Sequence, residues 1–268
     1  MVDLIVLPRA GSGEPAAMMP CNGGVQGRTP RARGATAPLL TGEHPLDTGR
    51  VLVIAPHPDD EVLGAGGTIA RLSDSGAEVI VAVVTTGAPP LFAEAVTAKV
   101  RCEARSAHAC LGVARTVFLD QPAARLDQIP HHELNRALGE LVREVAPDTL
   151  LLPFVGDIHL DHQLTFLSAM VAARPHGAAF PGRILCYETL SETNWNAPLM
   201  TPSFVPNLFV DISAQLERKL DAMRLYGSQQ REFPHERSLA ALRALAMLRG
   251  STVHRPAAEA FMLVRQVI

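Results

Sequence analysis

The sequence predicts an α/β fold: a Rossmann-like, doubly wound, mainly parallel sheet with helices on both faces and a mixed C-terminal extension. Two observations predict it. Continuous runs of Val, Ile and Leu recur from residue 51 onward, and each is only as long as a buried strand. Segments whose apolar residues have helical spacing separate these runs. Strands that alternate with helices form parallel sheets covered on both faces, and right-handed crossovers then give the doubly wound arrangement.

The first half of the fold alternates regularly. We expect strands at residues 51–57, 77–87, 116–120 and 148–154, and helices at 60–75, 93–112, 132–145 and 162–173. In the first helix, Val62, Ile69 and Leu72 are spaced to face the core. The strands show little alternation of polar and apolar residues, which is typical of strands buried on both faces.

The second half is mixed. We expect strands at 183–190, 208–213 and 259–265, and helices at 214–226 and 236–250. Residues 8–50 are rich in Gly, Pro, Ala and Thr and show neither strand nor helix periodicity. The sequence therefore predicts a flexible leader at 1–49 and a single folded domain at 50–268.

Composition excludes several classes of function. The net charge of −3 and the aromatic content of 4% argue against binding to nucleic acid or a membrane surface. No apolar run is long enough to span a membrane, and the N-terminus lacks the basic region of a secretory signal. The four cysteines include no C-x-x-C pair, which fits a reducing compartment. We expect a cytoplasmic protein with a small-molecule partner, and self-association into a homo-oligomer stays open.

Two clusters of His and Asp follow two of the predicted strands. "PHPDDE" (56–61) comes at the end of the first strand, and "GDIHLDHQ" (156–163) comes just after the fourth. In the usual strand order of a doubly wound sheet, the first and fourth strands flank the crevice in which ligands bind. The two clusters are therefore expected to meet across that crevice.

The residue types in these clusters suit a metal ion. His57 and Asp60 are three positions apart at a strand-to-helix turn, and His159 and His162 repeat that spacing. One carboxylate and two imidazoles form a three-ligand set of the kind that holds a catalytic zinc ion and leaves a position for water. Such a metal lowers the pKa of the water and polarises a carbonyl group.

The remaining polar residues of the clusters suit acid–base chemistry. Asp59 lies beside Asp60 but points differently, so it is the natural general base. A histidine of the second cluster would then be the acid. Asp161 is placed to orient His159 and to favour its protonated form.

The first cluster also has two alternative interpretations. Acids are common at helix starts because they complement the helix dipole, so Asp59, Asp60 and Glu61 could be structural. The following "GAGG" (64–67) raises the alternative of a dinucleotide site. It lies within the helix, does not form G-x-G-x-x-G, and follows three acids that would repel a pyrophosphate. We expect these glycines to let the helix pack closely on the sheet.

The two clusters together resemble the motifs of a known family. "PHPDDE" together with "HLDH" (159–162) resembles the PIG-L/LmbE-like de-N-acetylases, metal-dependent enzymes that remove acetyl groups from N-acetylglucosaminyl and related amino-sugar substrates. The resemblance extends over residues 50–266 and includes "VRCEARSAHACLGV" (100–113), "YET" (187–189), "VPNLFVDIS" (205–213), "KLDAMRLYGSQ" (219–229) and "AEAF" (258–261).

The resemblance implies a zinc-dependent deacetylase domain at 50–268, in which His57, Asp60 and His162 bind Zn2+ or another divalent metal such as Fe2+. Its substrate would be a small amino-sugar molecule. Two alternatives stay open: an amidase acting on a larger amide conjugate of a sugar, and a sugar-binding relative without catalytic activity.

For the catalytic residues, the resemblance implies Asp59 as general base. It implies His159 as general acid or as stabiliser of the oxyanion, with Asp161 supporting it. Metal-activated water would attack the acetamide carbonyl, and acetate would leave.

Three further positions can be compared with the family individually. Arg101 matches a position that resembles a substrate contact, with a surface ion pair to Glu103 or Glu94 as the alternative. Leu160 stands where the family motif has proline. Asp157 stands where some relatives carry a tyrosine, and we expect it to cap the next helix, to bond a ligand histidine or to contact substrate.

Overall fold

The computed structural model describes residues 49–176 and 180–268, so the predicted leader lies outside the described residues except for Gly49. The strands are β1 (Arg50–Ala55), β2 (Glu78–Thr86), β3 (Arg115–Pro122), β4 (Thr149–Pro153), β5 (Arg183–Tyr187), β6 (Leu208–Asp211) and β7 (Ala258–Gln266). The helices are α1 (Asp60–Asp74), α2 (Glu94–Leu111), α3 (His131–Val145), α4 (Leu160–Ala172), α5 (Leu216–Leu225) and α6 (Leu239–Thr252), with short 3-10 helices η1 (Leu126–Gln128) and η2 (Thr193–Trp195). Every predicted strand and helix is present within a few residues of its expected bounds, whereas η1 and η2 were not predicted.

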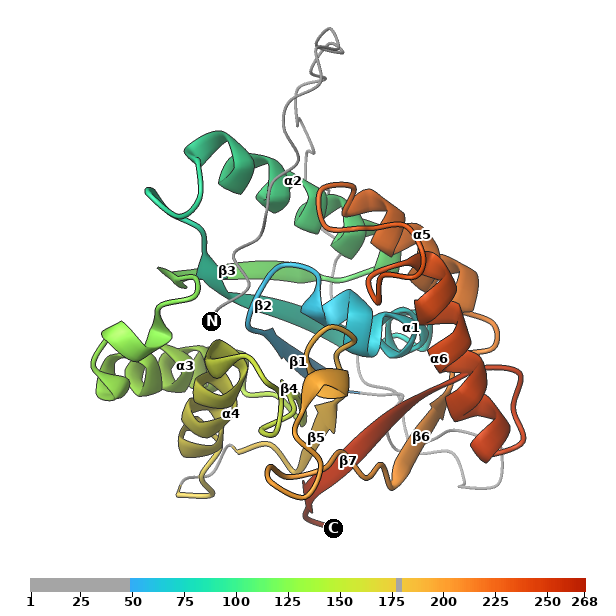
Figure 1. The fold of residues 1–268 in the computed structure, drawn as a ribbon. Helices are drawn as coiled ribbons and strands as arrows, with labels where there is room; N and C mark the ends of the chain where they lie inside the picture. Colours follow the sequence, from blue (N-terminus) through green and yellow to red (C-terminus); the bar gives the residue numbers. More distant parts are fainter. Residues whose placement is uncertain (1–48, 177–179) are drawn as a thin grey trace, which may run out of the picture. The chain divides into compact units, whose positions relative to one another are not determined.

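The strands form one sheet in the order β3-β2-β1-β4-β5-β7-β6 (Figure 1). The pairs from β3 to β5 are parallel, and β7 runs antiparallel to both β5 and β6. The doubly wound, mainly parallel prediction is confirmed, and the mixed C-terminal extension continues the same sheet. Because β1 and β4 are neighbours, the chain changes winding direction between them, which is where such folds bind ligands.

Helices cover both faces of the sheet because side chains alternate along each buried strand. Val51 and Val53 of β1 join one core cluster with residues of α1, α2, α5 and α6. Leu52 and Ile54 join the other cluster, with residues of α3 and α4. All four strand residues are at most 1% exposed, as a continuous apolar run predicts.

The glycines of α1 allow its close packing. A Cβ atom on Gly67 would lie 2.7 Å from Cδ1 of Ile212, and one on Gly64 would overlap the ring of Tyr187. These contacts confirm the packing role expected for "GAGG", since any side chain here would push α1 away from its neighbours.

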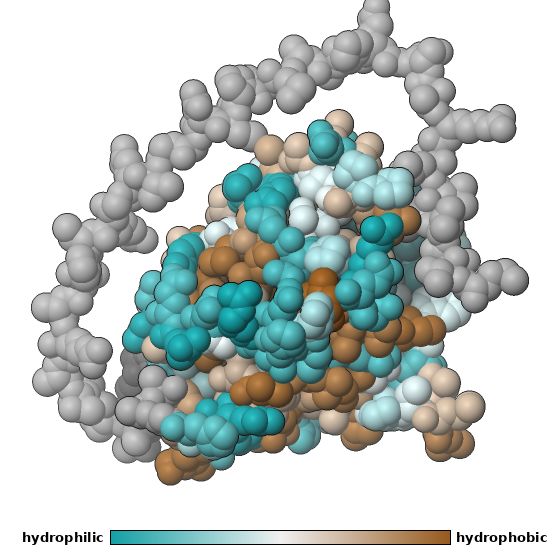
Figure 2. Space-filling model, turned by 90° about the vertical axis from the view of Figure 1, so that its left-hand side faces the viewer, coloured by the Kyte–Doolittle hydropathy of each residue, from teal (hydrophilic) through white to brown (hydrophobic). Residues whose placement is uncertain are grey.

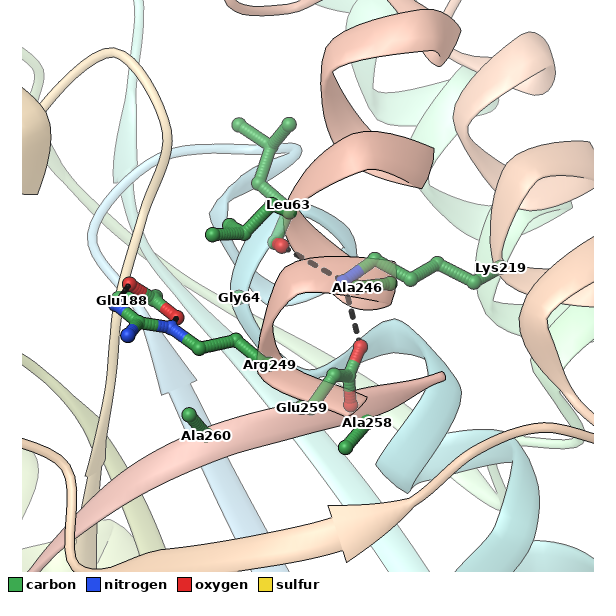
Figure 3. A pocket seen from close by; sticks show the side chains of 10 residues that line it. Leu63, Gly64, Glu188, Lys219, Ala246, Arg249, Ala258, Glu259 and Ala260 are labelled. Carbon is green, nitrogen blue, oxygen red and sulfur yellow. Dashed lines mark hydrogen bonds and ion pairs between the residues drawn. The ribbon is translucent and has the colours of Figure 1, made fainter. Parts of the chain in front are cut away.

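A buried ion pair ties α1 to α5 and β7 (Figure 3). Lys219 Nζ donates to Glu259 Oε1 at 2.6 Å and to the Leu63 carbonyl at 2.9 Å. Glu259 in turn accepts the backbone N–H groups of Gly67 and Thr68 at 2.8 and 2.6 Å. The charges compensate each other and are hydrogen-bonded, as buried ions must be, so the pair fixes α1 in place.

The surface contains no continuous apolar face in the view of Figure 2, where hydrophobic residues alternate with hydrophilic ones. Within residues 49–176 and 180–268, no helix has the length and apolar character needed to cross a membrane.

Candidate metal and catalytic site

The two predicted clusters meet where β1 and β4 end. The strands pair in parallel from Val51 with Thr149 to Val53 with Leu151, so the loops after them leave the same edge of the sheet. His57 from the first loop lies 4.5 Å from His159 of the second, measured between ring centroids. The strand order assumed from the sequence is therefore correct, and it brings the clusters together.

Three side chains form a group of metal-ligand type. Ligand atoms of His57, Asp60 and His162 all lie within 4.8 Å of one another. Oδ2 of Asp60 lies 3.4 Å from Nδ1 of His57 and 3.1 Å from Nε2 of His162. Nε2 of His162 is buried yet has no aligned hydrogen-bond partner. A buried ring nitrogen aimed beside a carboxylate without a hydrogen bond is suited to a metal ion.

The other ring nitrogen of each histidine is held by a carboxylate. His57 Nε2 donates to Asp161 Oδ2 at 3.0 Å, and His162 Nδ1 donates to Asp157 Oδ2 at 2.8 Å. Such contacts fix the tautomer and orientation of metal-binding histidines. The hydrogen bond expected between Asp157 and a histidine of the second cluster is present. The cap of α4 is instead His159, whose Nδ1 accepts the N–H of Asp161 at 3.1 Å.

The electrostatics of the group favour positive charge. Burial alone would lower the pKa of His57, but its bonds to Asp161 and Asp60 raise that pKa to about 9. Burial alone would raise the pKa of Asp60, but the neighbouring His162 holds it well below its ordinary value. An environment that stabilises cationic imidazoles and an anionic carboxylate will also stabilise a bound cation.

Asp161 has a different partner from the one expected. Its carboxylate was expected to orient His159, but it bonds His57 and accepts the backbone N–H groups of Ala124 and Leu126 at 2.7 and 3.2 Å. Its oxygen still lies within 4.8 Å of a ring nitrogen of His159. Asp161 therefore interacts with His159 through the charge of its nearby carboxylate and through its peptide N–H, not through a carboxylate hydrogen bond.

His159 is held in a form that favours the neutral ring. Burial lowers its pKa to about 4, and the neighbouring His57 and His162 act in the same direction. Because its Nδ1 accepts the Asp161 N–H, the ring proton of the neutral form is on Nε2. Asp161 raises the pKa of His159, as expected, but burial and the two neighbouring histidines lower it by more.

Asp59 sits at the start of α1 in a strained conformation. Its φ of 111° lies in the left-handed region, which is unusual for a residue other than glycine. Its side chain is 2% exposed, and its Oδ2 has no hydrogen-bond partner but lies 3.4 Å from Nη1 of Arg237. Burial raises the pKa of Asp59 to about 7, and the Arg237 charge opposes that rise.

A buried hydrogen-bond network behind Asp59 was not predicted from the sequence. Glu61 was expected only as support for the helix start, but it is fully buried and Oε2 accepts the Asp59 N–H at 3.2 Å. Its Oε1 accepts from His108 Nε2 at 3.0 Å and from the Tyr226 hydroxyl at 2.6 Å. The only sequence signal was that all three residues fall within the stretches that resemble the family. The network braces the strained backbone of Asp59.

Arg101 has partners outside this group. Its guanidinium pairs with Asp120 and stacks over the ring of Phe118, 4.2 Å from the ring centroid. The alternative expectation, an ion pair of Arg101 with Glu103 or Glu94, was therefore wrong. Its substrate contact stays a prediction.

Comparisons with known proteins identify relatives of this chain. Residues 52–173 match the family described as PIG-L, GlcNAc-PI de-N-acetylase. The chain is 31% identical over 229 residues to diacetylchitobiose deacetylase of Thermococcus kodakarensis, covering 81% of this chain and 84% of that protein. It is 27% identical over 230 residues to 2'-N-acetylparomamine deacetylase of Streptomyces fradiae, covering 75% and 80% of the two chains. The solved structure of N,N'-diacetylchitobiose deacetylase from Pyrococcus horikoshii superposes with a TM-score of 0.65 and 28% identity, covering 80% of this chain and 83% of that one.

Proposed function

The chain belongs to the PIG-L/LmbE-like family of de-N-acetylases, and we propose that it hydrolyses the N-acetyl group of an N-acetylglucosaminyl or related amino-sugar substrate, using a zinc ion. It is an amide hydrolase of the N-deacetylase type, as its named relatives are. The names of those relatives share one chemical feature, an acetylated amino group on a sugar, which is the substrate class we assign here.

The observation that carries the proposal is the group His57, Asp60 and His162 beside the buried Asp59. Two imidazoles and one carboxylate form a mixed nitrogen and oxygen donor set, which suits zinc, and the unpartnered Nε2 of His162 supports that assignment. When bound, the metal would lower the pKa of a water molecule and polarise the acetamide carbonyl.

Asp59 is proposed as the general base. It neighbours the ligand Asp60, yet its own Oδ2 is unpartnered and faces Arg237. A pKa raised by burial to about 7 suits a group that accepts a proton from the attacking water near neutral pH. The oxygen of that water then bonds to the carbonyl carbon.

His159 is proposed to stabilise the oxyanion. Its geometry places the ring proton on Nε2, which can donate a hydrogen bond to the developing negative charge. The C–N bond then breaks, the proton taken up by Asp59 passes to the leaving amine, and acetate departs. Of the two roles expected for His159, the hydrogen-bond donor is favoured over the full proton donor because its pKa is lowered.

The direct test is release of acetate from N-acetylglucosamine and N,N'-diacetylchitobiose, followed by proton NMR. Zinc-loaded protein should release acetate and protein stripped with a chelator should not. Addition of zinc should restore activity. Hydrolysis of a sugar amide that carries a larger acyl group, without acetate release from either sugar, would favour the amidase alternative. No hydrolysis of any of these amides would contradict the proposed substrate class.

A further inference from the structure

Trp195 is the one tryptophan of the chain, and it presents a fixed aromatic surface to solvent. It lies in η2 with 58% of its surface exposed. Its indole N–H donates to Glu236 Oε1 at 3.0 Å, and its peptide N–H donates to the Glu192 carbonyl at 3.3 Å. The ring is therefore anchored at its polar edge while much of its surface stays accessible, an arrangement that suits ligand contact.

Two short chains of contacts connect Trp195 to the metal-ligand group. On one side, Thr193 of the same 3-10 helix donates to Asp157 Oδ1 at 2.5 Å, and Asp157 accepts from His162. On the other side, the anchoring Glu236 precedes Arg237, which pairs with Asp59. Trp195 is thus linked to His162 through Thr193 and Asp157, and to Asp59 through Glu236 and Arg237.

A second exposed apolar side chain is connected to the same loop as Trp195. Ile158 follows Asp157 and is 58% exposed, and its N–H donates to the Glu192 carbonyl at 3.4 Å. Ile158 and Trp195 therefore share one backbone acceptor, the Glu192 carbonyl. Exposed apolar side chains beside polar anchors suit a ligand with an apolar face and a polar edge.

We propose that Trp195 determines substrate specificity by stacking on a second ring attached to the N-acetylated sugar. This inference rests on the proposed function. A pyranose ring has an apolar C–H face and a rim of hydroxyl groups, which matches the indole face and the nearby carboxylate of Glu236. The second ring is assigned because the acetamide must reach the metal-ligand group, whereas Trp195 is connected to that group only through intervening residues such as Thr193 and Asp157.

Kinetics with two substrates test the proposal. In Trp195→Ala, we expect KM for N,N'-diacetylchitobiose to rise about five- to tenfold, the size of a lost aromatic contact. We expect kcat, and KM for N-acetylglucosamine, to change less than about twofold, and Trp195→Phe to recover most of the loss. Leu199→Ala is the matched control, since Leu199 is a fully exposed apolar residue of the same loop.

The single tryptophan also supplies a binding signal. In zinc-loaded Asp59→Asn protein, N,N'-diacetylchitobiose should change the fluorescence of Trp195 in a saturable way, and N-acetylglucosamine should change it much less. An unchanged KM for the disaccharide in Trp195→Ala, or an equal change in KM for both sugars, would overturn the inference. If the wild-type protein still released acetate, the proposed function would stand. Absence of acetate release from both sugars by wild-type protein would instead remove the proposed function, and the inference with it.

Discussion

Nη1 of Arg237 lies 3.4 Å from Oδ2 of Asp59 and brings the loop before α6 to the turn between β1 and α1. Arg237 is 25% exposed and also lies 3.7 Å from Glu192, and its Nε donates to Ser191 Oγ at 3.0 Å. The guanidinium is thus held by the β5–β6 connection while it faces the proposed base. This contact gives Asp59 a defined orientation, and it leads to the first prediction.

Arg237→Ala should lower kcat about tenfold with unchanged zinc content, because Asp59 keeps its carboxylate but loses the charge that orients it. Arg237→Lys should lie between this variant and wild type. Steady-state kinetics with metal analysis measure both effects. The control is Arg243→Ala, which removes an exposed pair with Glu217 and should leave kcat unchanged. Equal kcat values for the Arg237 and Arg243 variants would contradict the positioning role.

Asp59→Asn should reduce kcat by about 10²- to 10⁴-fold, the usual contribution of a general base, because an amide cannot accept the proton. Zinc should stay bound at wild-type stoichiometry, since Asp59 is outside the proposed ligand set. Acetate release and elemental analysis of the same sample measure both. Activity within tenfold of wild type would remove Asp59 as the base, and loss of zinc would make it a ligand.

His162→Ala should lose both zinc and activity, because it removes one of three proposed ligands and leaves Asp60 buried beside a void. The control is His132→Ala, at an exposed position in the first turn of α3. Circular dichroism establishes that both variants fold. A folded His162→Ala protein with full zinc content would refute the assigned ligand set.

Asp157→Asn should weaken zinc affinity about 10- to 100-fold, because the carboxylate that holds Nδ1 of His162 becomes a neutral amide. Competition with a chromogenic chelator gives the affinity. Asp127→Asn, at an exposed position in η1, should bind zinc as wild type does. The same affinity in both variants would mean that Asp157 has no effect on the metal.

Gly67→Ala should destabilise the fold by about 1–3 kcal/mol, because the added Cβ would lie 2.7–2.9 Å from three atoms of Ile212. Gly139→Ala is the matched control in α3, since a Cβ there meets no atom within 4 Å. It should stabilise the fold by up to about 1 kcal/mol through helix propensity. Urea unfolding measures both free energies. Equal shifts would show that α1 can move away from its neighbours without cost.

Local patterns in the sequence were sufficient for the architecture and for the core of the site. The apolar runs of β1 and β4 predicted buried strands, and the usual strand order of a doubly wound sheet predicted that the His and Asp clusters after them would meet. The resemblance to the family selected His162 rather than His159 as the partner of His57. Strand burial and the point at which a loop leaves a strand both depend on short, contiguous stretches of sequence. They could therefore be predicted without the tertiary structure.

Only the tertiary structure decided the partners of those residues. Asp161 was expected to orient His159, but its carboxylate bonds His57. Glu61 lies in the first turn of α1 as expected, but it also accepts from His108 and Tyr226, which was not predicted. Such contacts join segments that lie far apart in the chain, and the orientation of each side chain depends on the packing around it.

The fold class, the order of the elements and the residue types in the crevice could all be predicted from the sequence, because periodicity and motif spacing are local properties of the chain. The tertiary structure alone decided that Arg237 faces Asp59 and that Trp195 is anchored by Glu236. The physical reason is that these pairings arise from loops after β5 and before α6, whose paths follow the packing of the whole sheet rather than any pattern in their own residues.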